Sequence, residues 1–204
     1  MTRLRFLLAR TLRNETALSG LSVPQADLLA AAAGRSVALV GNARALAQQR
    51  HGARIDAAGL VVRINRAPIP STESHGTRTD WLALAVRLPA ADRQRLQPRR
   101  ILWMSPKRKR LDWATARSPG FYLHPRADVR ALGDQLGAPP STGIMAIALL
   151  LRAPLESLTL YGFDFFASQS LSGSRSAAQV PHDFAAEAEW VRAHAARDPR
   201  LRIS

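Results

Sequence analysis

Two asparagines directly follow apolar segments that predict the first two strands of a sheet. Asn42 ends the run ALVGN, and Asn65 ends the run VVRIN. In an open parallel sheet, ligands bind beyond the carboxyl ends of the strands, and an asparagine there offers donors and an acceptor without adding charge. This pair could hold a ribose hydroxyl or a phosphate oxygen. The alternative for each asparagine is a turn residue or a helix cap.

A second candidate binding group lies in the segment PPSTGIMAIALLL. Its two prolines force an extended entry, and Ser141, Thr142 and Gly143 then open an apolar helix. Free backbone amides and the positive end of the helix dipole would make this helix start an anion site. Gly143 would let a ligand approach closely. Plain capping of the helix is the alternative.

A histidine stands at the start of the last predicted helix. Pro181 and Asp183 mark this start, so His182 lies near the positive end of the helix dipole, which disfavours the charged imidazolium. A neutral imidazole near pH 7 is what a general base requires. Glu187, about one turn inside the helix, could reach back to orient the ring or cap the backbone. A histidine that caps a surface helix is the alternative.

Short apolar runs alternate with helical stretches, and these elements must position the polar residues. Strands are expected at 37–40, 60–64, 81–85, 101–104, 121–123 and 158–161. Helices are expected at 89–96, 127–136, 142–152 and 184–197. Several strands are apolar throughout, which is typical of strands buried on both faces of a parallel sheet. The alternation predicts an α/β domain with a mostly parallel, Rossmann-like sheet flanked by helices.

We expect a helical preface at residues 1–34 and the main domain at residues 35–204. A helix at the start of the chain would place four leucines on one face: Leu4, Leu7, Leu8 and Leu12. That face could lie on an anionic membrane or contact a partner, and packing against the domain is the alternative. The first apolar stretch is too short for a signal peptide, and no apolar run is long enough to cross a bilayer.

The net charge of +14 favours an anionic partner, because 27 of the 29 basic residues are arginines, which suit phosphates and carboxylates. Nucleic acid, anionic lipid and acidic sugars are the candidates. The spread of basic residues along the chain and the presence of two tyrosines argue against nucleic acid. The absence of cysteine excludes disulfides and thiolate ligands and suits a reducing cytoplasm. The five histidines have no metal-ligand spacing, and no metal is expected.

Two segments interrupt the alternation of strands and helices. Residues 107–110 are four consecutive basic residues after a strand end, and we expect a solvated loop there. Residues 168–180 are small, polar and rich in serine. They predict either a disordered insertion or a lid over the site.

In their order along residues 36–190, the segments resemble the sialylmotifs of glycosyltransferase family 29, the sialyltransferases. The large motif is matched at Gly41, Asn42, Leu46, Gly52, Ile55, Asp56, Val61, Arg63, Asn65, Ala67 and Pro68. The small motif is matched at Pro140, Ser141, Thr142, Gly143, Tyr161, Gly162 and Phe163. The very small motif is matched by His182 and Glu187, which four residues separate.

The resemblance implies a compact, bacterial-type enzyme with a GT-A-like variant of the Rossmann-like fold. Such an enzyme would transfer an acidic sugar, sialic acid or else Kdo, from a CMP donor to a hydroxyl of a glycan or glycolipid. The reaction would invert the anomeric centre and need no metal or other cofactor. We expect a cytoplasmic protein, peripheral at the inner membrane surface.

The resemblance also implies a role for each motif residue. Asn42 and Asn65 would hold the ribose and phosphate of the nucleotide, and the short turn at Gly41 fits one phosphate. Ser141, Thr142 and Gly143 would contact the donor around its phosphate and sugar carboxylate. Tyr161 and Gly162 would complete the donor site. His182 would be the general base, with Glu187 beside it. Arg63 would brace the sheet or pair with Asp56, and Arg78 would stabilise a loop near the donor or lie at the surface.

The chain departs from the family pattern at two points. It has no cysteine for the disulfide that links the large and small motifs in animal enzymes. The third short motif, rich in His and Tyr, should assist the phosphate leaving group, but residues 164–181 contain neither residue type. Arg175 could supply the positive charge instead. The alternative function is a degenerate CMP-binding protein or a basic nucleic-acid-binding protein.

Overall fold

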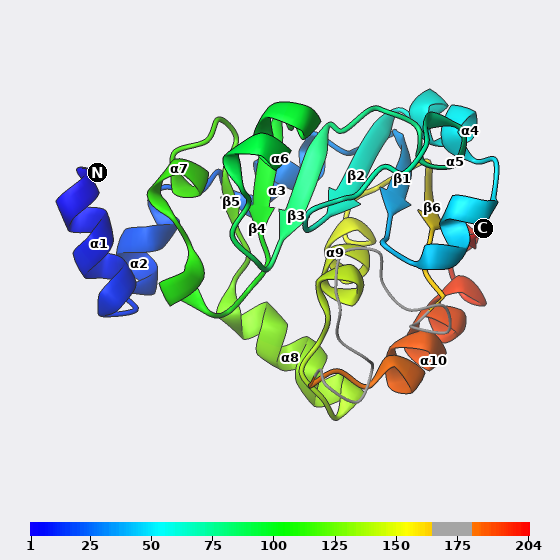
Figure 1. Ribbon diagram of the computed structural model, residues 1–204. Coiled ribbons are helices and arrows are strands. Elements are labelled where there is room, and N and C mark those ends of the chain that lie inside the picture. The colour runs from blue at the N-terminus through cyan, green and yellow to red at the C-terminus, as the bar shows by residue number, and fades with distance from the viewer. Residues whose placement is uncertain (165–180) are drawn as a thin grey trace.

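The computed structural model in Figure 1 describes residues 1–164 and 181–204. Within these residues one seven-stranded sheet has the order β5-β4-β3-β2-β1-β6-β7, and every neighbouring pair is parallel. The strands are β1 (Ser36–Val40), β2 (Leu60–Ile64), β3 (Trp81–Leu84), β4 (Arg100–Trp103), β5 (Tyr122–Leu123), β6 (Ser157–Tyr161) and β7 (Leu201–Ile203). The prediction of a Rossmann-like α/β fold is therefore confirmed.

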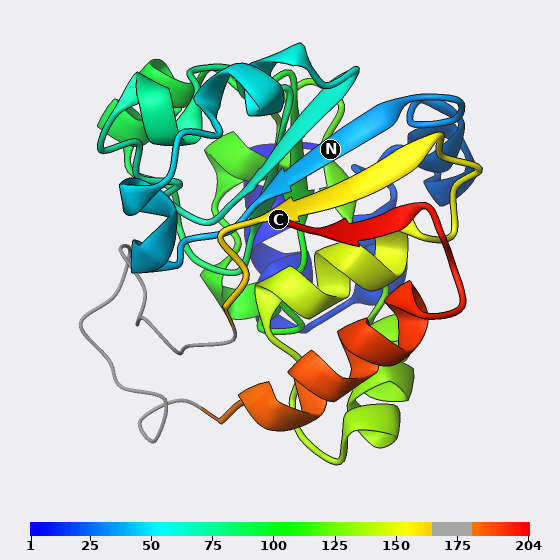
Figure 2. The same cartoon turned by 90° about the vertical axis from the view of Figure 1, so that its right-hand side faces the viewer.

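Helices cover both faces of the sheet, as Figure 2 shows in a view toward the edge of the sheet. They are α1 (Arg3–Thr11), α2 (Glu15–Ser19), α3 (Gln25–Ala30), α4 (Gly52–Ala57), α5 (Thr72–His75), α6 (Ala90–Leu96), α7 (Trp113–Ala116), α8 (Arg126–Leu136), α9 (Thr142–Leu150) and α10 (Phe184–Ala195), with short 3₁₀ turns η1 (Arg44–Gln48) and η2 (Arg108–Arg110). On one face α8, α9 and α10 pack over the central strands, and α4, α5 and α6 lie on the other. Helix α9 is apolar on nearly every side because it lies against the sheet with helices around it.

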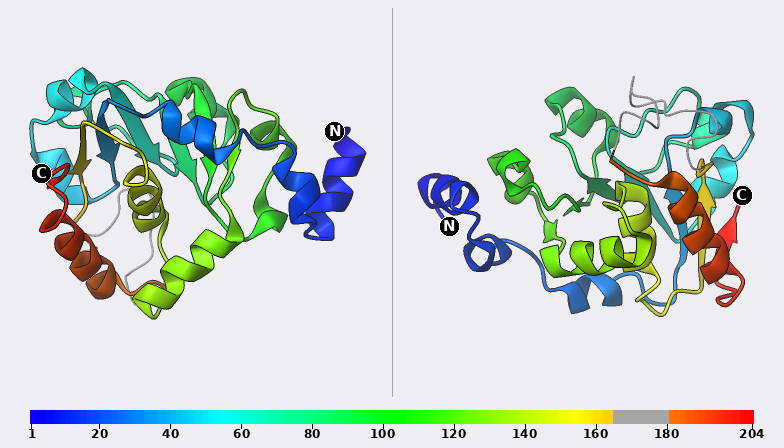
Figure 3. Two further views of the ribbon diagram at one scale, coloured as in Figure 1. Left: turned by 180° about the vertical axis from the view of Figure 1, so that it is seen from behind. Right: turned by 90° about the horizontal axis from the view of Figure 1, so that it is seen from below.

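All six expected strands and all four expected helices are present, with ends shifted by a few residues. Strand β7 and several short helices were not expected. Residues 1–34 form α1 to α3, of which α3 contributes Leu28 to the largest core cluster. Figure 3 shows α1 and α2 at one end of the molecule, remote from the C-terminus. None of the described helices has both the length and the apolar character needed to traverse a bilayer.

The fold buries a histidine that should make stability depend on pH. His124 follows β5, and burial, opposed by the charge of Asp128, lowers its pKa from 6.5 to about 4. Between these values the unfolded chain binds a proton that the folded protein excludes, so stability falls as pH drops from about 6.5 to 4. We expect His124 to account for about 2 kcal/mol of the stability lost between pH 7 and 4.5.

Urea unfolding of the wild type and His124→Gln at both pH values would measure this contribution. The variant is expected to lose less stability on acidification than the wild type. Equal losses in the two proteins would show that His124 does not carry the effect.

Candidate functional site

The two strand-end asparagines each tie one strand to its neighbour. Asn42 is buried, and its Nδ2 donates to the carbonyl oxygen of Ile64 at 3.3 Å. Asn65 has a φ of +53°, in the left-handed region that asparagine tolerates better than most residues. Its Oδ1 accepts from the Ala85 amide at 3.0 Å, and its Nδ2 lies 3.5 Å from Thr142 Oγ1. The asparagines therefore join the ends of β1, β2 and β3 to the start of α9.

The groups at the start of α9 have more hydrogen-bond partners within the protein than the sequence indicated. The Ser141 hydroxyl caps the helix by accepting from the Ile144 amide at 3.4 Å. The Ser141 amide and hydroxyl both donate to the carboxylate of Glu187, each at 2.7 Å. By contrast, the amides of Thr142 and Gly143 have no acceptor among residues 1–164 and 181–204. Of the three residues expected to form an anion site, Ser141 is hydrogen-bonded to Glu187. The two amides and the Thr142 hydroxyl are the groups that remain for an anion.

Glu187 connects α10 to α9 and makes neither of the contacts expected for it. Its side chain is 3% exposed, and burial raises the pKa of its carboxyl, although the two hydrogen bonds from Ser141 oppose the rise. The cap of α10 is supplied by Asp183, whose side chain accepts from the Ala186 amide at 3.0 Å. The His182 ring has a different hydrogen-bond partner. Glu187 thus fixes the two helix starts to each other.

The imidazole of His182 is held by the backbone that precedes α9. Its Nδ1 lies 2.7 Å from the carbonyl oxygen of Pro139. Because a carbonyl can only accept, Nδ1 carries the hydrogen, and in the neutral ring Nε2 keeps the lone pair. The ring also packs edge-on against Phe184, with 5.8 Å between centroids. Nε2 is therefore the atom that could take a proton from a substrate.

The Phe163 ring fills the space in front of two motif glycines. A Cβ added to Gly143 would lie 2.8 Å from Phe163 Cε1. A Cβ added to Gly41 would lie 3.1 Å from Phe163 Cδ2 and 2.3 Å from the carbonyl oxygen of Gly162. The Phe163 ring therefore takes the space that a side chain at position 143 would need, and the close approach of a ligand to the Gly143 backbone stays a prediction. Sequence reasoning gave Phe163 no role, although an aromatic residue after Tyr161-Gly162 was a visible signal.

Tyr161 lies on the other side of the sheet from α9. Its ring is 5.3 Å from that of His51, and it packs in the cluster that contains Ile55 of α4. It also lines a pocket of ≈ 310 Å³ together with Arg54. The structure therefore does not bring the Tyr161 ring to the group around Asn65, whereas Gly162 turns the chain with a φ of +68°. Arg175 and the expected lid at 168–180 lie outside the described residues.

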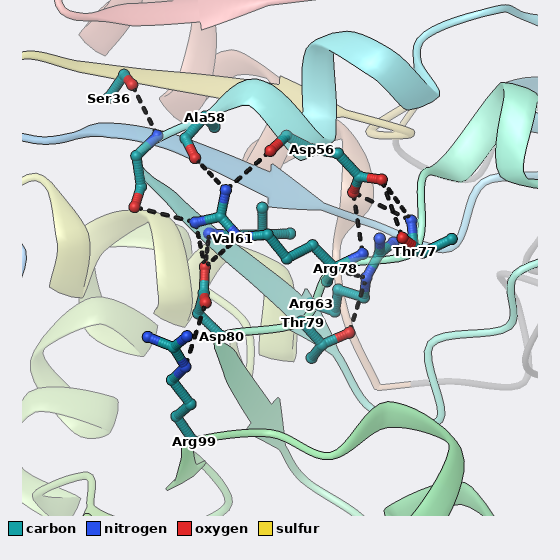
Figure 4. Close-up of polar contacts among 11 residues, drawn as sticks. Ser36, Asp56, Ala58, Val61, Arg63, Thr77, Arg78, Thr79, Asp80 and Arg99 are labelled. Carbon is teal, nitrogen blue, oxygen red and sulfur yellow. Dashed lines mark hydrogen bonds and ion pairs between the residues drawn. The ribbon is translucent and has the colours of Figure 1, made fainter.

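Other residues of the large motif hold the fold rather than face the site, as Figure 4 shows for Asp56 and its neighbours. The Asp56 carboxylate accepts from the Thr77 amide at 2.8 Å and the Arg78 amide at 2.9 Å. Arg78 donates to Asp80 at 2.7 Å and to the Ala58 carbonyl at 2.6 Å. Asp80 immediately precedes β3, so Arg78 lies at the amino edge of the sheet and not near the strand-end asparagines.

Arg63 braces the same loop from within β2. It is 1% exposed, and its guanidinium donates to the carbonyl oxygens of Arg78 at 2.9 Å and His75 at 2.8 Å. Burial, opposed by the charge of Asp56, lowers the pKa of Arg63 to about 10. A direct ion pair with Asp56 is absent from the described contacts, so of the two expected roles Arg63 takes the bracing one.

The family model for glycosyltransferase family 29 (sialyltransferase) matches residues 10–118, more than half of the chain. The chain belongs to glycosyltransferase family 29. The matched range contains both strand-end asparagines and the Asp56 network, and it ends before α9. A sequence search finds no match among curated proteins.

Solved structures extend the likeness of this family 29 glycosyltransferase beyond the matched range. A crystal structure of a mammalian sialyltransferase in complex with Gal-beta-1-3GalNAc-ortho-nitrophenol has a TM-score of 0.62 and 22% identity. Another crystal structure of a mammalian sialyltransferase has a TM-score of 0.63 and 21% identity. Each alignment covers 84% of this chain and 69% of the mammalian chain. At this identity the likeness establishes the sialyltransferase fold.

Proposed function

We propose that this family 29 glycosyltransferase transfers an acidic sugar from a CMP donor to a glycan or glycolipid hydroxyl. Sialic acid is the sugar that we expect, and Kdo is the alternative. The observation that carries the proposal is the convergence of Asn65 and Thr142, whose side chains lie 3.5 Å apart. It brings the large and small motifs to one place beyond the strand ends, where α/β proteins bind ligands.

The groups at this place suit a phosphate that binds without a metal. The amides of Thr142 and Gly143 stand at the positive end of α9, and amide and hydroxyl side chains lie beside them. These uncharged groups would stabilise an anion through hydrogen bonds and the helix dipole. The absence of cysteine from the chain supports a reducing, cytoplasmic location.

In the proposed reaction, the acceptor oxygen attacks the anomeric carbon of the sugar. The bond from that carbon to the phosphate oxygen breaks, and its electron pair leaves with CMP. A single attack from the face opposite the leaving group inverts the anomeric centre. His182 Nε2 takes the proton of the acceptor hydroxyl, and the Pro139 carbonyl holds Nδ1–H in place. Arg175 remains our proposal for the charge that assists the departing phosphate.

Calorimetric titration with CMP, UMP and AMP tests the nucleotide site. We expect selective binding of CMP, and we expect Asn65→Ala to raise its Kd at least about tenfold, because the variant loses both the amide and its left-handed turn. Asn14→Ser is the matched control, since Asn14 caps α2 and serine also caps well. This control should bind CMP like the wild type.

A titration with a short oligonucleotide at physiological salt completes the experiment. Indifference to CMP combined with tight, salt-sensitive oligonucleotide binding would contradict the transferase proposal. It would favour the basic nucleic-acid-binding alternative. Selective CMP binding without transfer to any acceptor in a glycan screen would indicate a degenerate enzyme.

A further inference from the structure

Exposed leucines gather on the first helix. Within the described residues, the large apolar side chains with high exposure are Met1, Leu4, Leu7, Leu8, Leu12 and Ile203. All except Ile203 lie within the first twelve residues, and Leu4 and Leu12 are 69% and 75% exposed. An exposed cluster of this kind on a folded protein usually marks an interaction surface.

The leucines are exposed because α1 packs on the protein by its opposite side. Phe6 and Ala9 are buried, and the Phe6 ring lies 5.2 Å from that of Trp113. The guanidinium of Arg10 donates to the carbonyl oxygen of Leu111 at 3.0 Å. At 3.6 residues per turn, these three residues share one side of the helix, and the leucines fall on the other. We name Leu4, Leu7, Leu8 and Leu12 the leucine face.

Positive charge borders the leucine face on both sides. Arg3 and Arg5 are exposed and, by the same helical spacing, fall at its two margins. Residues 1–13 include no acidic residue. The sequence had indicated such a face but had also allowed its packing against the domain, and the structure shows that the leucines do not pack there.

A second basic segment is fixed beside α1. Arg108 of η2 is buried, and its guanidinium binds the Glu15 carboxylate of α2 at 3.0 Å and the His124 carbonyl at 2.6 Å. This anchor leaves Lys107, Lys109 and Arg110 exposed next to the first two helices. The run that the sequence predicted as a solvated loop thus adds three cations to the end of the molecule that carries the leucine face.

We propose that the leucine face and these flanking cations bind the surface of an anionic lipid bilayer. Leucines that enter the acyl boundary while arginine and lysine contact lipid phosphates are the pattern of interfacial helices. The segment with η2 follows the carboxyl end of β4, and the candidate active site lies beyond the carboxyl ends of β1 and β2 in the same sheet. The basic segment and the candidate active site thus both follow the carboxyl ends of strands in this sheet.

Cosedimentation with vesicles tests this surface without any sugar donor or acceptor. Vesicles of phosphatidylcholine alone are compared with vesicles of equal parts phosphatidylcholine and phosphatidylglycerol. We expect binding to the anionic vesicles that weakens as salt rises. The variant Leu4→Gln/Leu8→Gln/Leu12→Gln should lower the partition coefficient at least about tenfold. The variant Lys107→Ala/Lys109→Ala/Arg110→Ala should lower binding to the anionic vesicles about tenfold and leave binding to the phosphatidylcholine vesicles unchanged.

Ile203→Gln is the matched control, because Ile203 is an exposed apolar residue of β7 at the far edge of the sheet. It should bind vesicles like the wild type, and thermal unfolding should show all variants folded. Wild-type indifference to anionic vesicles, or full binding by the leucine variant, would overturn the proposal. Light scattering that shows leucine-dependent dimers without vesicle binding would assign the face to a second copy. None of these results would affect the transferase proposal, which titration with CMP tests separately.

Discussion

Replacing His182 by alanine is expected to abolish sugar transfer while leaving CMP binding nearly intact. The Pro139 carbonyl holds Nδ1–H at 2.7 Å, so Nε2 presents its lone pair in a fixed direction. Loss of a positioned base costs about 10²- to 10⁴-fold in rate. In the proposed site the nucleotide contacts come from the strand ends and the first residues of α9, and His182 touches this region through the Pro139 carbonyl rather than through the groups proposed to bind the nucleotide. The effect should therefore appear in kcat and not in the Kd for CMP.

Rates of transfer to an acceptor identified by a glycan screen, together with titration of CMP, would measure both quantities. His194→Ala is the matched control, because His194 lies on the same helix and contacts Trp190 near its other end. It should retain wild-type transfer. Loss of both transfer and CMP binding in His182→Ala would contradict the role as base and indicate a structural one.

Gly52→Ala is expected to cause the largest loss of stability among the glycine-to-alanine substitutions in the large motif. Gly52 opens α4 against the backbone of α5 and is buried. An added Cβ would lie 1.9 Å from the Thr72 carbonyl oxygen and 2.7 Å from that of Glu73. Backbone atoms cannot move aside as a flexible side chain can, so the two helices would have to separate. We expect a loss of about 3 kcal/mol, at the upper end for overpacking.

Thermal unfolding should register this loss as a fall in Tm on the order of 10 °C. Gly20→Ala is the matched control, since a Cβ there would meet nothing closer than 3.5 Å and Gly20 has an ordinary helical φ of −63°. The control should change stability by less than about 0.5 kcal/mol. Equal Tm values for Gly52→Ala and the wild type would show that α4 and α5 can separate at little cost.

Most of the sheet could be predicted because its strands are buried on both faces. β1 is apolar after Ser36, and β2 is apolar except for Arg63, so both strands can be recognised without knowledge of the neighbouring strands. Strand β7 lies at the sheet edge with only Leu201 buried, so its three residues carry too weak a pattern. The short helices α4 and α5 are defined by their contact with each other, which four to six residues of sequence cannot show.

The residues of the candidate site were predictable by type and position, but their partners were not. Ser141 and Glu187 are 46 positions apart, and nothing in either segment indicates that one binds the other. The sequence also could not indicate the contact of His182 with a backbone carbonyl oxygen, because every residue type carries that oxygen. The position of the Phe163 ring in front of Gly143 was unpredictable for the same reason, since the two residues come from different segments.

Asp56 and Arg63 hold the loop that precedes β3, and this structural role has a consequence for how the large motif is inherited. A substitution that silences the chemistry would leave the demand for these residues unchanged, because the loop they hold must still form. A descendant without activity would therefore keep most of the large motif. On the proposed roles of His182 as base and Asn65 as a nucleotide contact, genomic surveys for working transferases of this type should rank chains by these two positions before they count the other matched positions.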